Sequence, residues 1–149
     1  VGFALSKKMK KEEGTVYVLM SDGEMQTGTT WEAALIAAYH KLDNLVVIVD
    51  NNLLQAMGKT KDVLAVEPLS EKWQSFGWEW SYNSGHDAQE LHNRFSNIEW
   101  LKTKTHRPQV IIANTIKGKG VSFFEHNNLW HYRAPVEEEY NLALEELNK

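Results

Sequence analysis

Three short runs of apolar, often β-branched residues constrain the fold of this chain most strongly. They cover residues 16–20, 45–49 and 109–115, and each has the length of a buried strand. Segments in which apolar residues recur at helical spacing separate them, most clearly residues 30–42 and 87–102. Apolar strands that alternate with helices are typical of a parallel sheet covered by helices on both faces. We therefore predict an α/β fold with a mainly parallel sheet.

The remaining segments complete a single domain, which we place at residues 1–149. Thr29 with Glu32 and Asp87 with Glu90 have the spacing of a capping box and are predicted to begin the two helices. The other predicted elements are a helix that ends near Lys11, a short helix that carries Leu69, Trp73 and Phe76 and ends at Gly77, a strand at residues 78–82, and a terminal helix from Pro135 that carries Tyr140, Leu144 and Leu147.

The composition narrows the classes of function that are open to the chain. There is no cysteine, which excludes disulfides, thiolate catalysis and cysteine-based zinc sites. The formal net charge of −4 argues against nucleic acid and anionic membranes, because surfaces that bind them are normally basic. No apolar run approaches the roughly 20 residues that span a bilayer. We therefore expect no nucleic-acid partner and no membrane partner, and we expect a cytoplasmic location.

Polar or glycine-rich clusters follow three of the predicted strands. They are residues 21–23 (Ser-Asp-Gly), 50–52 (Asp-Asn-Asn) and 117–120 (Lys-Gly-Lys-Gly). In open α/β sheets, ligands bind beyond the carboxyl ends of the strands. The three clusters are therefore predicted to border one crevice.

Asp22 and Asn52 are the candidate metal ligands at this edge. A carboxylate and an amide oxygen are hard ligands suited to magnesium, which usually binds one or two carboxylates together with substrate phosphates. Gly23 allows the backbone to approach a phosphate oxygen because it has no Cβ. The alternative is that Asp22 and Asn52 only form turns, as these residue types often do at strand ends.

A larger set of motifs resembles the thiamine diphosphate domain of transketolases. The family pattern reads Gly-Asp-Gly, then a stretch of roughly the length found here, then Asn, and the resemblance covers nearly the whole chain. It implies the three-layer thiamine-diphosphate-binding fold. The family's Gly-Gln-Gly-Leu segment would lie upstream of Val1, so we expect the N-terminal part of the domain to be missing. The motifs are residues 22–26 (DGEMQ), Gly28, 31–33 (WEA), 42–45 (LDNL), Asp50, Asn52, 54–55 (LQ), Gly58, 67–69 (EPL), Trp73, 76–78 (FGW), 85–87 (GHD), 117–123 (KGKGVSF), 130–131 (WH) and 134–135 (AP).

Carried over to this sequence, the resemblance implies a metal site with three protein ligands. These are the side chains of Asp22 and Asn52 and the backbone carbonyl of Leu54. The metal would be Mg²⁺, or Ca²⁺ or Mn²⁺ in its place, and the cofactor would be thiamine diphosphate.

The resemblance also implies direct contacts to the cofactor. The amide of Gly23 matches the glycine that meets the diphosphate, and Glu24 beside it is counted among the cofactor-binding residues. His131 matches the histidine that contacts the diphosphate and faces the donor substrate, a role suited to imidazole near neutral pH. The alternative for His131 is a surface position in a tail. His40 and His86 are interpreted as structural, and His92, His106 and His126 have no ligand spacing.

Three positions depart from the family pattern. Ser21 replaces the first glycine of the triplet, which a serine can do where φ is negative. Thr27 stands where many transketolases have a glutamate at the subunit contact, and threonine cannot carry that charge. Glu32, roughly one helical turn further on, is the candidate to serve catalysis in its place. Tyr132 follows His131 at a position where glycine is frequent in the family. We expect these three departures to affect the rate of the reaction or the choice of substrate, and not metal binding.

The function implied by the resemblance is two-carbon ketol transfer between sugar phosphates, with this chain as the diphosphate- and metal-binding half. The acid that activates the aminopyrimidine lies in a separate domain in the family. We therefore expect a C-terminal transketolase subunit or domain as partner, in a homodimer or heterotetramer. The alternatives are a deoxyxylulose-phosphate synthase or ketoacid dehydrogenase subunit, and a non-catalytic or regulatory paralogue. A dinucleotide-binding domain is disfavoured, because no Gly-x-Gly-x-x-Gly motif opens a helix after a strand.

Overall fold

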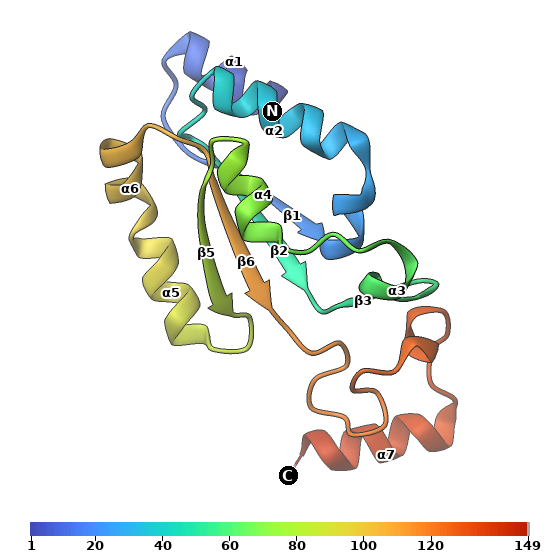
Figure 1. The fold of residues 1–149 in the computed structure, drawn as a ribbon. Helices are drawn as coiled ribbons and strands as arrows, with labels where there is room; N and C mark the ends of the chain where they lie inside the picture. Colours follow the sequence, from blue (N-terminus) through green and yellow to red (C-terminus); the bar gives the residue numbers. More distant parts are fainter. Residues whose placement is uncertain (149) are drawn as a thin grey trace.

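The computed structural model describes residues 1–148, and a parallel four-stranded sheet forms its centre (Figure 1). The strand order is β1-β2-β6-β5. The strands are β1 (Val16–Ser21), β2 (Leu45–Asn51), β5 (Glu79–Ser84) and β6 (Gln109–Asn114). β2 and β6 lie at the centre and are buried along nearly their whole length. The predicted strands and the α/β class are confirmed.

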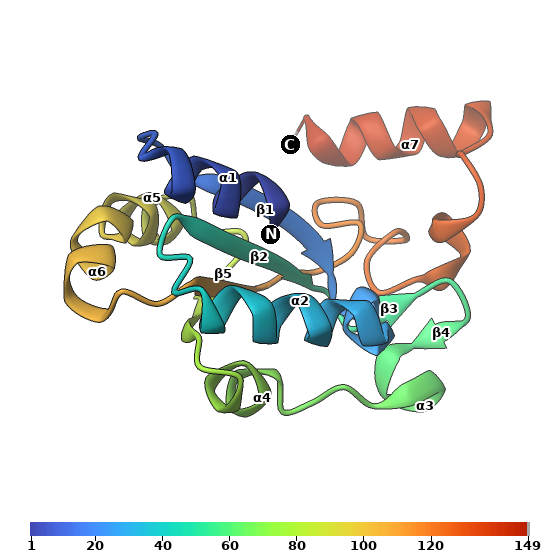
Figure 2. The same cartoon turned by 90° about the horizontal axis from the view of Figure 1, so that it is seen from above.

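Helices lie on both faces of the sheet (Figure 2). One face packs against α1 (Gly2–Lys10), α2 (Gly28–Tyr39) and α4 (Leu69–Ser75). The other face packs against α5 (Ala88–Ser96) and α6 (Ile98–Thr105). This arrangement explains why the central strands read as continuous apolar runs.

The larger core lies between α2, α4 and the sheet. Ala34 and Ala37 of α2 are buried, so the helix lies close to the strands. Trp73 meets Trp78 edge-on with 4.6 Å between ring centroids, and Trp78 Nε1 donates a 3.0 Å hydrogen bond to the carbonyl of Ala34. Burial of a large apolar side chain contributes about 1.5–3 kcal/mol. The two tryptophans therefore fix α2, and the turn that precedes it, on the sheet.

The segment predicted as one helix over residues 87–102 is two helices, α5 and α6. The Asn97 side chain donates a 2.9 Å hydrogen bond to the carbonyl of Asn93, and the chain changes direction there. The change of direction places Ile98 in the core, where it is 1% exposed. The cap at Asp87 is confirmed, because its Oδ1 accepts a 2.9 Å hydrogen bond from the Glu90 N–H.

The capping box predicted at Thr29 and Glu32 was wrong. α2 begins two residues earlier than this prediction requires, at Gly28 with Thr27 as its N-cap, so Thr29 lies inside the first turn. No side chain caps this end of α2. A box with the same spacing lies instead at the end of β1.

The carboxyl ends of the four parallel strands meet at one edge of the sheet, and the remaining segments gather beyond it (Figures 1 and 2). The last of these segments is the C-terminal arm, residues 115–148. The predicted terminal helix is confirmed, although it begins at Glu137. The elements at this edge are the 3₁₀ helix η1 (Asp22–Gln26), β3 (Leu54–Gln55), β4 (Gly58–Lys59), α3 (Thr60–Leu64), the 3₁₀ helix η2 (Asn128–His131) and α7 (Glu137–Leu147).

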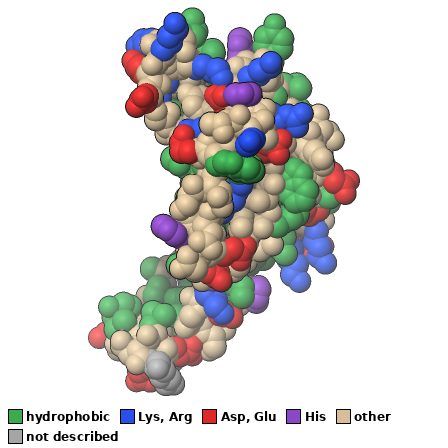
Figure 3. Space-filling view, turned by 90° about the vertical axis from the view of Figure 1, so that its left-hand side faces the viewer, with side chains coloured by type: hydrophobic (Ala, Val, Ile, Leu, Met, Phe, Trp, Pro, Cys, Tyr) green, Lys and Arg blue, Asp and Glu red, His purple; other side chains and the backbone are tan. Residues whose placement is uncertain are grey.

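Acidic and basic side chains are interspersed on the face shown in Figure 3. Some form surface ion pairs, such as Arg107 with Glu79 at 3.2 Å, which contribute little to stability individually. Within residues 1–148, no helix has the length and apolar character needed to cross a membrane.

Candidate functional site

Asp22 directly follows β1 and is 0% exposed. Its Oδ2 accepts a 2.7 Å hydrogen bond from the N–H of Leu53, whereas its Oδ1 is buried without a hydrogen-bond partner in the described chain. Burial raises the pKa of Asp22, and the carboxylates of Asp50 and Glu67 raise it further, against the lowering effect of the Leu53 and Gly23 N–H groups. A buried carboxylate with one unused oxygen is costly unless a proton or a cation binds there.

Asn52 lies on the loop that supplies the Leu53 N–H. Its Oδ1 accepts a 2.9 Å hydrogen bond from the Leu54 N–H, and its Nδ2 donates to Asp50 Oδ2 at 3.2 Å. The structure therefore brings Asp22 together with the 52–54 loop, as predicted for residues at neighbouring strand ends. No group of three or more His, Cys, Asp or Glu side chains in residues 1–148 could hold a metal ion. A metal here would need amide, carbonyl and phosphate oxygens as well, which is how magnesium is usually held.

Ser21 and Glu24 form the capping box of η1. The Ser21 Oγ accepts a hydrogen bond from the Glu24 N–H at 3.3 Å, and Glu24 Oε2 accepts one from the Ser21 N–H at 2.7 Å. Ser21 has a φ of −87°, so the negative φ expected for serine at this position is confirmed. The Glu24 carboxylate is thus occupied within the turn that carries Asp22. A Cβ on Gly23, also in this turn, would lie only 3.3 Å from Oε1 of Gln55.

Removal of the Ser21 hydroxyl should destabilise this turn. We expect Ser21→Ala to lower the free energy of unfolding by about 1 kcal/mol, the usual effect of losing an N-cap side chain. Urea denaturation followed by circular dichroism measures it. Ser6→Ala, at an exposed position of α1, is the control and should be neutral or slightly stabilising. Equal midpoints for wild type and Ser21→Ala would contradict a stabilising role for the box.

A cavity of about 550 Å³ opens beside the 52–54 loop. Its other walls come from α3 with the residues that follow it, and from Thr115 and His126 of the C-terminal arm. The arm is fixed at its start, because the Ile116 N–H donates a 2.7 Å hydrogen bond to Nε2 of His86. This bond agrees with the structural interpretation of His86. The volume lies in the range of small-molecule sites, about 300–1,000 Å³.

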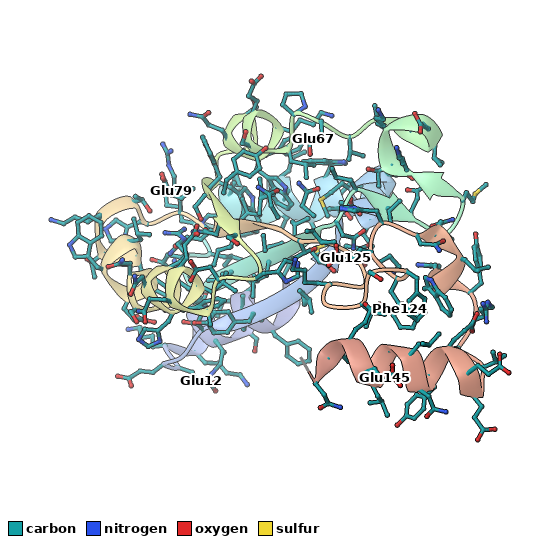
Figure 4. The ribbon with its side chains drawn as sticks, turned by 90° about the horizontal axis from the view of Figure 1, so that it is seen from below. Glu12, Glu67, Glu79, Phe124, Glu125 and Glu145 are labelled. Atoms are coloured by element: carbon teal, nitrogen blue, oxygen red, sulfur yellow. The ribbon has the colours of Figure 1, made fainter. Side chains whose placement is uncertain are left out.

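The arm folds back on itself beside this cavity. Gly118 and Gly120 have positive φ values of 77° and 98°, and the Gly120 N–H donates to the Glu125 carboxylate at 3.1 Å. The ring of Phe124 packs on Trp130 with 4.2 Å between centroids. Figure 4 shows Phe124 and Glu125 on this part of the arm, beside α7. These contacts define the 117–126 turn, which holds His126 at the cavity.

His131 does not line this cavity. It lies on η2, is exposed, and packs its ring edge-on against Tyr132 with 5.5 Å between centroids. Its ring forms no hydrogen bond to any described residue, Asp22 included. η2 itself is anchored near the site, because Nδ2 of Asn128 donates a 2.9 Å hydrogen bond to the carbonyl of Ala56. The role of His131 therefore stays a prediction.

Thr27 and Glu32 belong to the start of α2, and both are exposed. Thr27 and Glu24 border a second cavity of about 340 Å³ between α2 and the sheet. Glu32 lines neither cavity and forms no hydrogen bond or ion pair with residues 1–148. The structure does not bring Glu32 to Asp22, and its contact with another subunit stays a prediction.

Sequence reasoning missed Leu53 and His126, which both line the cavity. The His126 N–H donates to the carbonyl of Lys117 at 3.1 Å, which closes the 117–126 turn. The glycine-rich residues 117–120 indicated such a turn, but nothing in the spacing linked His126 to Asn52.

Comparison with known proteins identifies the family. Residues 6–147 match the family model described as the transketolase, thiamine diphosphate binding domain. The chain belongs to the transketolase family. It is 44% identical over 147 residues to one of the apulose-4-phosphate transketolase subunits of Actinobacillus succinogenes, and 38% identical over 149 residues to 6-deoxy-6-sulfo-D-fructose transketolase subunit SqwG of a Clostridium species. These matches cover 99% and 100% of this chain but only 52% and 53% of the relatives, so the chain spans about half their length.

A solved structure shows the same transketolase fold. Transketolase from Campylobacter jejuni matches with a TM-score of 0.87 and 28% identity, over 99% of this chain and 24% of that one. Human transketolase is 34% identical over 125 residues, which cover 84% of this chain and 19% of the human protein. The predicted resemblance to the transketolase thiamine diphosphate domain is confirmed.

The residues of this transketolase domain fit a divalent metal and a diphosphate. The buried Oδ1 of Asp22 has no partner in the described chain and can accept a cation. Asn52 and Leu54 follow on the loop that fixes the other Asp22 oxygen. Gly23 leaves its backbone without a Cβ at the same turn.

Proposed function

We propose that this chain holds the diphosphate and the divalent metal of thiamine diphosphate in a two-subunit transketolase. The supporting observation is the state of Asp22: one oxygen is fixed by the Leu53 N–H and the other is buried and unpaired in the described chain. The side chains of Asp22 and Asn52 and the carbonyl of Leu54 bind Mg²⁺, or Ca²⁺ or Mn²⁺ in its place. The Gly23 N–H donates to a diphosphate oxygen.

When bound, thiamine diphosphate would supply the carbanion chemistry that two-carbon transfer requires. The residues of this chain orient the cofactor and balance its charge. Asp22 is held by Leu53 before any ligand arrives, so little reorganisation accompanies metal binding. Glu24 contributes through Ser21, because the capping box fixes the turn. His131 donates a hydrogen bond to an anionic oxygen of the diphosphate or the donor, a role that needs η2 to approach the site.

The proposed reaction is ketol transfer between phosphorylated or sulfonated sugars. Two relatives with 44% and 38% identity are named as subunits of apulose-4-phosphate transketolase, and another with 38% identity is named for 6-deoxy-6-sulfo-D-fructose. Each of these substrates joins a sugar to a strong anionic group. We therefore propose an anionic ketose as donor and a sugar phosphate as acceptor.

The proposed partner is a C-terminal transketolase subunit that binds the aminopyrimidine. This arrangement is supported by the relatives whose names describe them as single subunits of a transketolase. The chain would act as one domain in a cytoplasmic homodimer or heterotetramer, and the acid that activates the aminopyrimidine would come from the partner.

Reconstitution tests this proposal. The purified chain alone should not turn over a ketose phosphate, and addition of the matching C-terminal subunit with Mg²⁺ and thiamine diphosphate should restore ketol transfer. A coupled assay of the aldose phosphate released from the donor measures the rate. Turnover by the chain alone at about 1 per second or more would contradict the half-enzyme proposal. A mixture that binds the cofactor without turnover would favour a non-catalytic role for this chain.

A further inference from the structure

Leu53 has a backbone conformation that leucine rarely adopts. Its φ is 63°, in the left-handed region where a Cβ is crowded and glycine is not. Three of the other positive-φ residues that are not glycine, Lys11, Lys41 and His106, lie at the ends of helices, where this conformation is common. Leu53 lies at no helix end. Its conformation therefore calls for another explanation.

The backbone contacts of Leu53 do not require a leucine. Its N–H donates to Asp22 Oδ2 at 2.7 Å, and its carbonyl accepts a 3.1 Å hydrogen bond from the N–H of Thr60. Glycine could make both bonds without crowding. Burial does not offset the crowding either, because Leu53 is 52% exposed. An unfavourable conformation that the surrounding contacts do not explain points to a function of the side chain.

Leu53 forms part of one wall of the 550 Å³ cavity, beside the proposed metal ligands. Ala65 and Val66 make this lining partly apolar. His126, which also has a positive φ, lines the cavity from the arm. Lys59 also borders the cavity, and its ammonium group forms no ion pair or hydrogen bond within residues 1–148. The cavity thus combines an apolar surface with groups that can bind an anion.

Lys61 is a second lysine in this lining, and its ammonium group also has no ion pair or hydrogen bond in the described chain. Glu67 also lines the cavity, and its carboxylate is hydrogen-bonded at the start of α4, where Oε2 accepts a 2.8 Å hydrogen bond from the Leu69 N–H. A sugar that carries a phosphate or sulfonate matches such a lining. Its C–H groups would pack against Leu53, and its anionic group would bind Lys59 and Lys61.

We propose that Leu53 determines substrate specificity, by forming the apolar wall against which the anionic sugar packs. This proposal rests on the proposed function, since it assumes that the reconstituted enzyme uses such sugars. In this proposal the Leu53 side chain contacts the sugar, and only the Leu53 backbone N–H contacts Asp22. Metal and cofactor binding should then be insensitive to the side chain at this position.

The test compares Leu53→Ala with Leu53→Gly in the reconstituted two-subunit enzyme. Both variants lose the wall, but only glycine relieves the crowded backbone. We expect the KM for the anionic ketose to rise roughly 10-fold in both, as for lost apolar contacts in a specificity pocket. Affinity for thiamine diphosphate with Mg²⁺, measured by calorimetry, should stay within about twofold of wild type. The melting temperature of Leu53→Gly should equal or exceed that of Leu53→Ala. Leu142→Ala, which changes a leucine on α7 with 53% exposure, is the matched control.

The outcomes separate this proposal from the proposed function. If wild type neither binds the cofactor with Mg²⁺ nor transfers a ketol unit, the proposed function fails. If wild type is active and Leu53→Ala retains the wild-type KM, the specificity role is overturned. A parallel loss of cofactor affinity in both variants would also overturn it, because the side chain would then contact the cofactor.

Discussion

Replacing Asp22 with asparagine should abolish metal-dependent binding of thiamine diphosphate and, in the same protein, stabilise the metal-free fold. The asparagine carbonyl can keep the hydrogen bond from the Leu53 N–H, but the negative charge that attracts the metal is lost. Loss of outer-shell support for a metal typically costs 10- to 100-fold in affinity, so loss of a direct ligand should cost at least about 100-fold. Calorimetry of the reconstituted complex with Mg²⁺ measures this effect.

The stabilisation arises from the buried oxygen. Without metal, Oδ1 of Asp22 is buried and unpaired in the described chain, and the neighbouring carboxylates of Asp50 and Glu67 repel its charge. Burial of a charged group costs more free energy than burial of a neutral amide, and asparagine removes both the charge and its repulsion from the two carboxylates. We therefore expect the Asp22→Asn variant to melt several degrees higher than wild type when both are free of metal.

Asp62→Asn, at an exposed position on α3, is the control and should change neither property. Addition of Mg²⁺ and thiamine diphosphate should raise the melting temperature of wild type and of this control only. Unchanged cofactor affinity in Asp22→Asn would refute the metal assignment. Lower stability of the metal-free variant would show that Oδ1 has a stabilising partner.

Substitution of Gly118 by alanine should disrupt the 117–126 turn and release the C-terminal arm from the site. Gly118 has a φ of 77°, and a Cβ there would lie 2.6 Å from the carbonyl oxygen of Phe124. A left-handed conformation alone costs an L-residue about 1–2 kcal/mol, and the overlap with backbone cannot be relieved by rotating a side chain. We expect a local loss of several kcal/mol, confined to the arm.

Hydrogen exchange reports on this change. Amides of residues 117–131 should exchange faster, whereas those of β2 and β6 should keep their protection. Gly28→Ala is the matched control, because a Cβ on Gly28 meets nothing within 4 Å and its φ is not positive. An intact arm in Gly118→Ala would mean that the turn can shift to admit a Cβ. Global unfolding would mean that the arm and sheet are one cooperative unit.

The strands, and the position of Asp22 close to the loop at Asn52, could be predicted from the sequence because both depend on the pattern of apolar residues along the chain. Apolar runs define parallel strands, and parallel strands place their ends at one edge. The hydrogen bond that joins them could not be predicted. It comes from the backbone N–H of Leu53, and every residue type except proline has such a group.

The error in capping shows why spacing alone is insufficient. Ser21 with Glu24 and Thr29 with Glu32 have the same separation, and sequence pattern cannot rank them. The choice depends on where the chain is extended: Ser21 has a ψ of 159° at the end of β1, whereas Thr29 is already helical. The positions of His126 and His131 depend similarly on a turn built from long-range contacts of the arm, which leave no periodic signal.

The strand order also determines when the sheet can form during synthesis. β6 pairs with β2 on one side and with β5 on the other, although it is the last of the four strands in the chain. The ribosome therefore releases β5 before the strand with which it pairs, at a typical rate of about 5–20 residues per second. Until Gln109 and the residues after it emerge, β2 and β5 have unpaired edges that can bind other chains. A nascent chain that stalls in this interval therefore exposes two strand edges at which aggregation can begin.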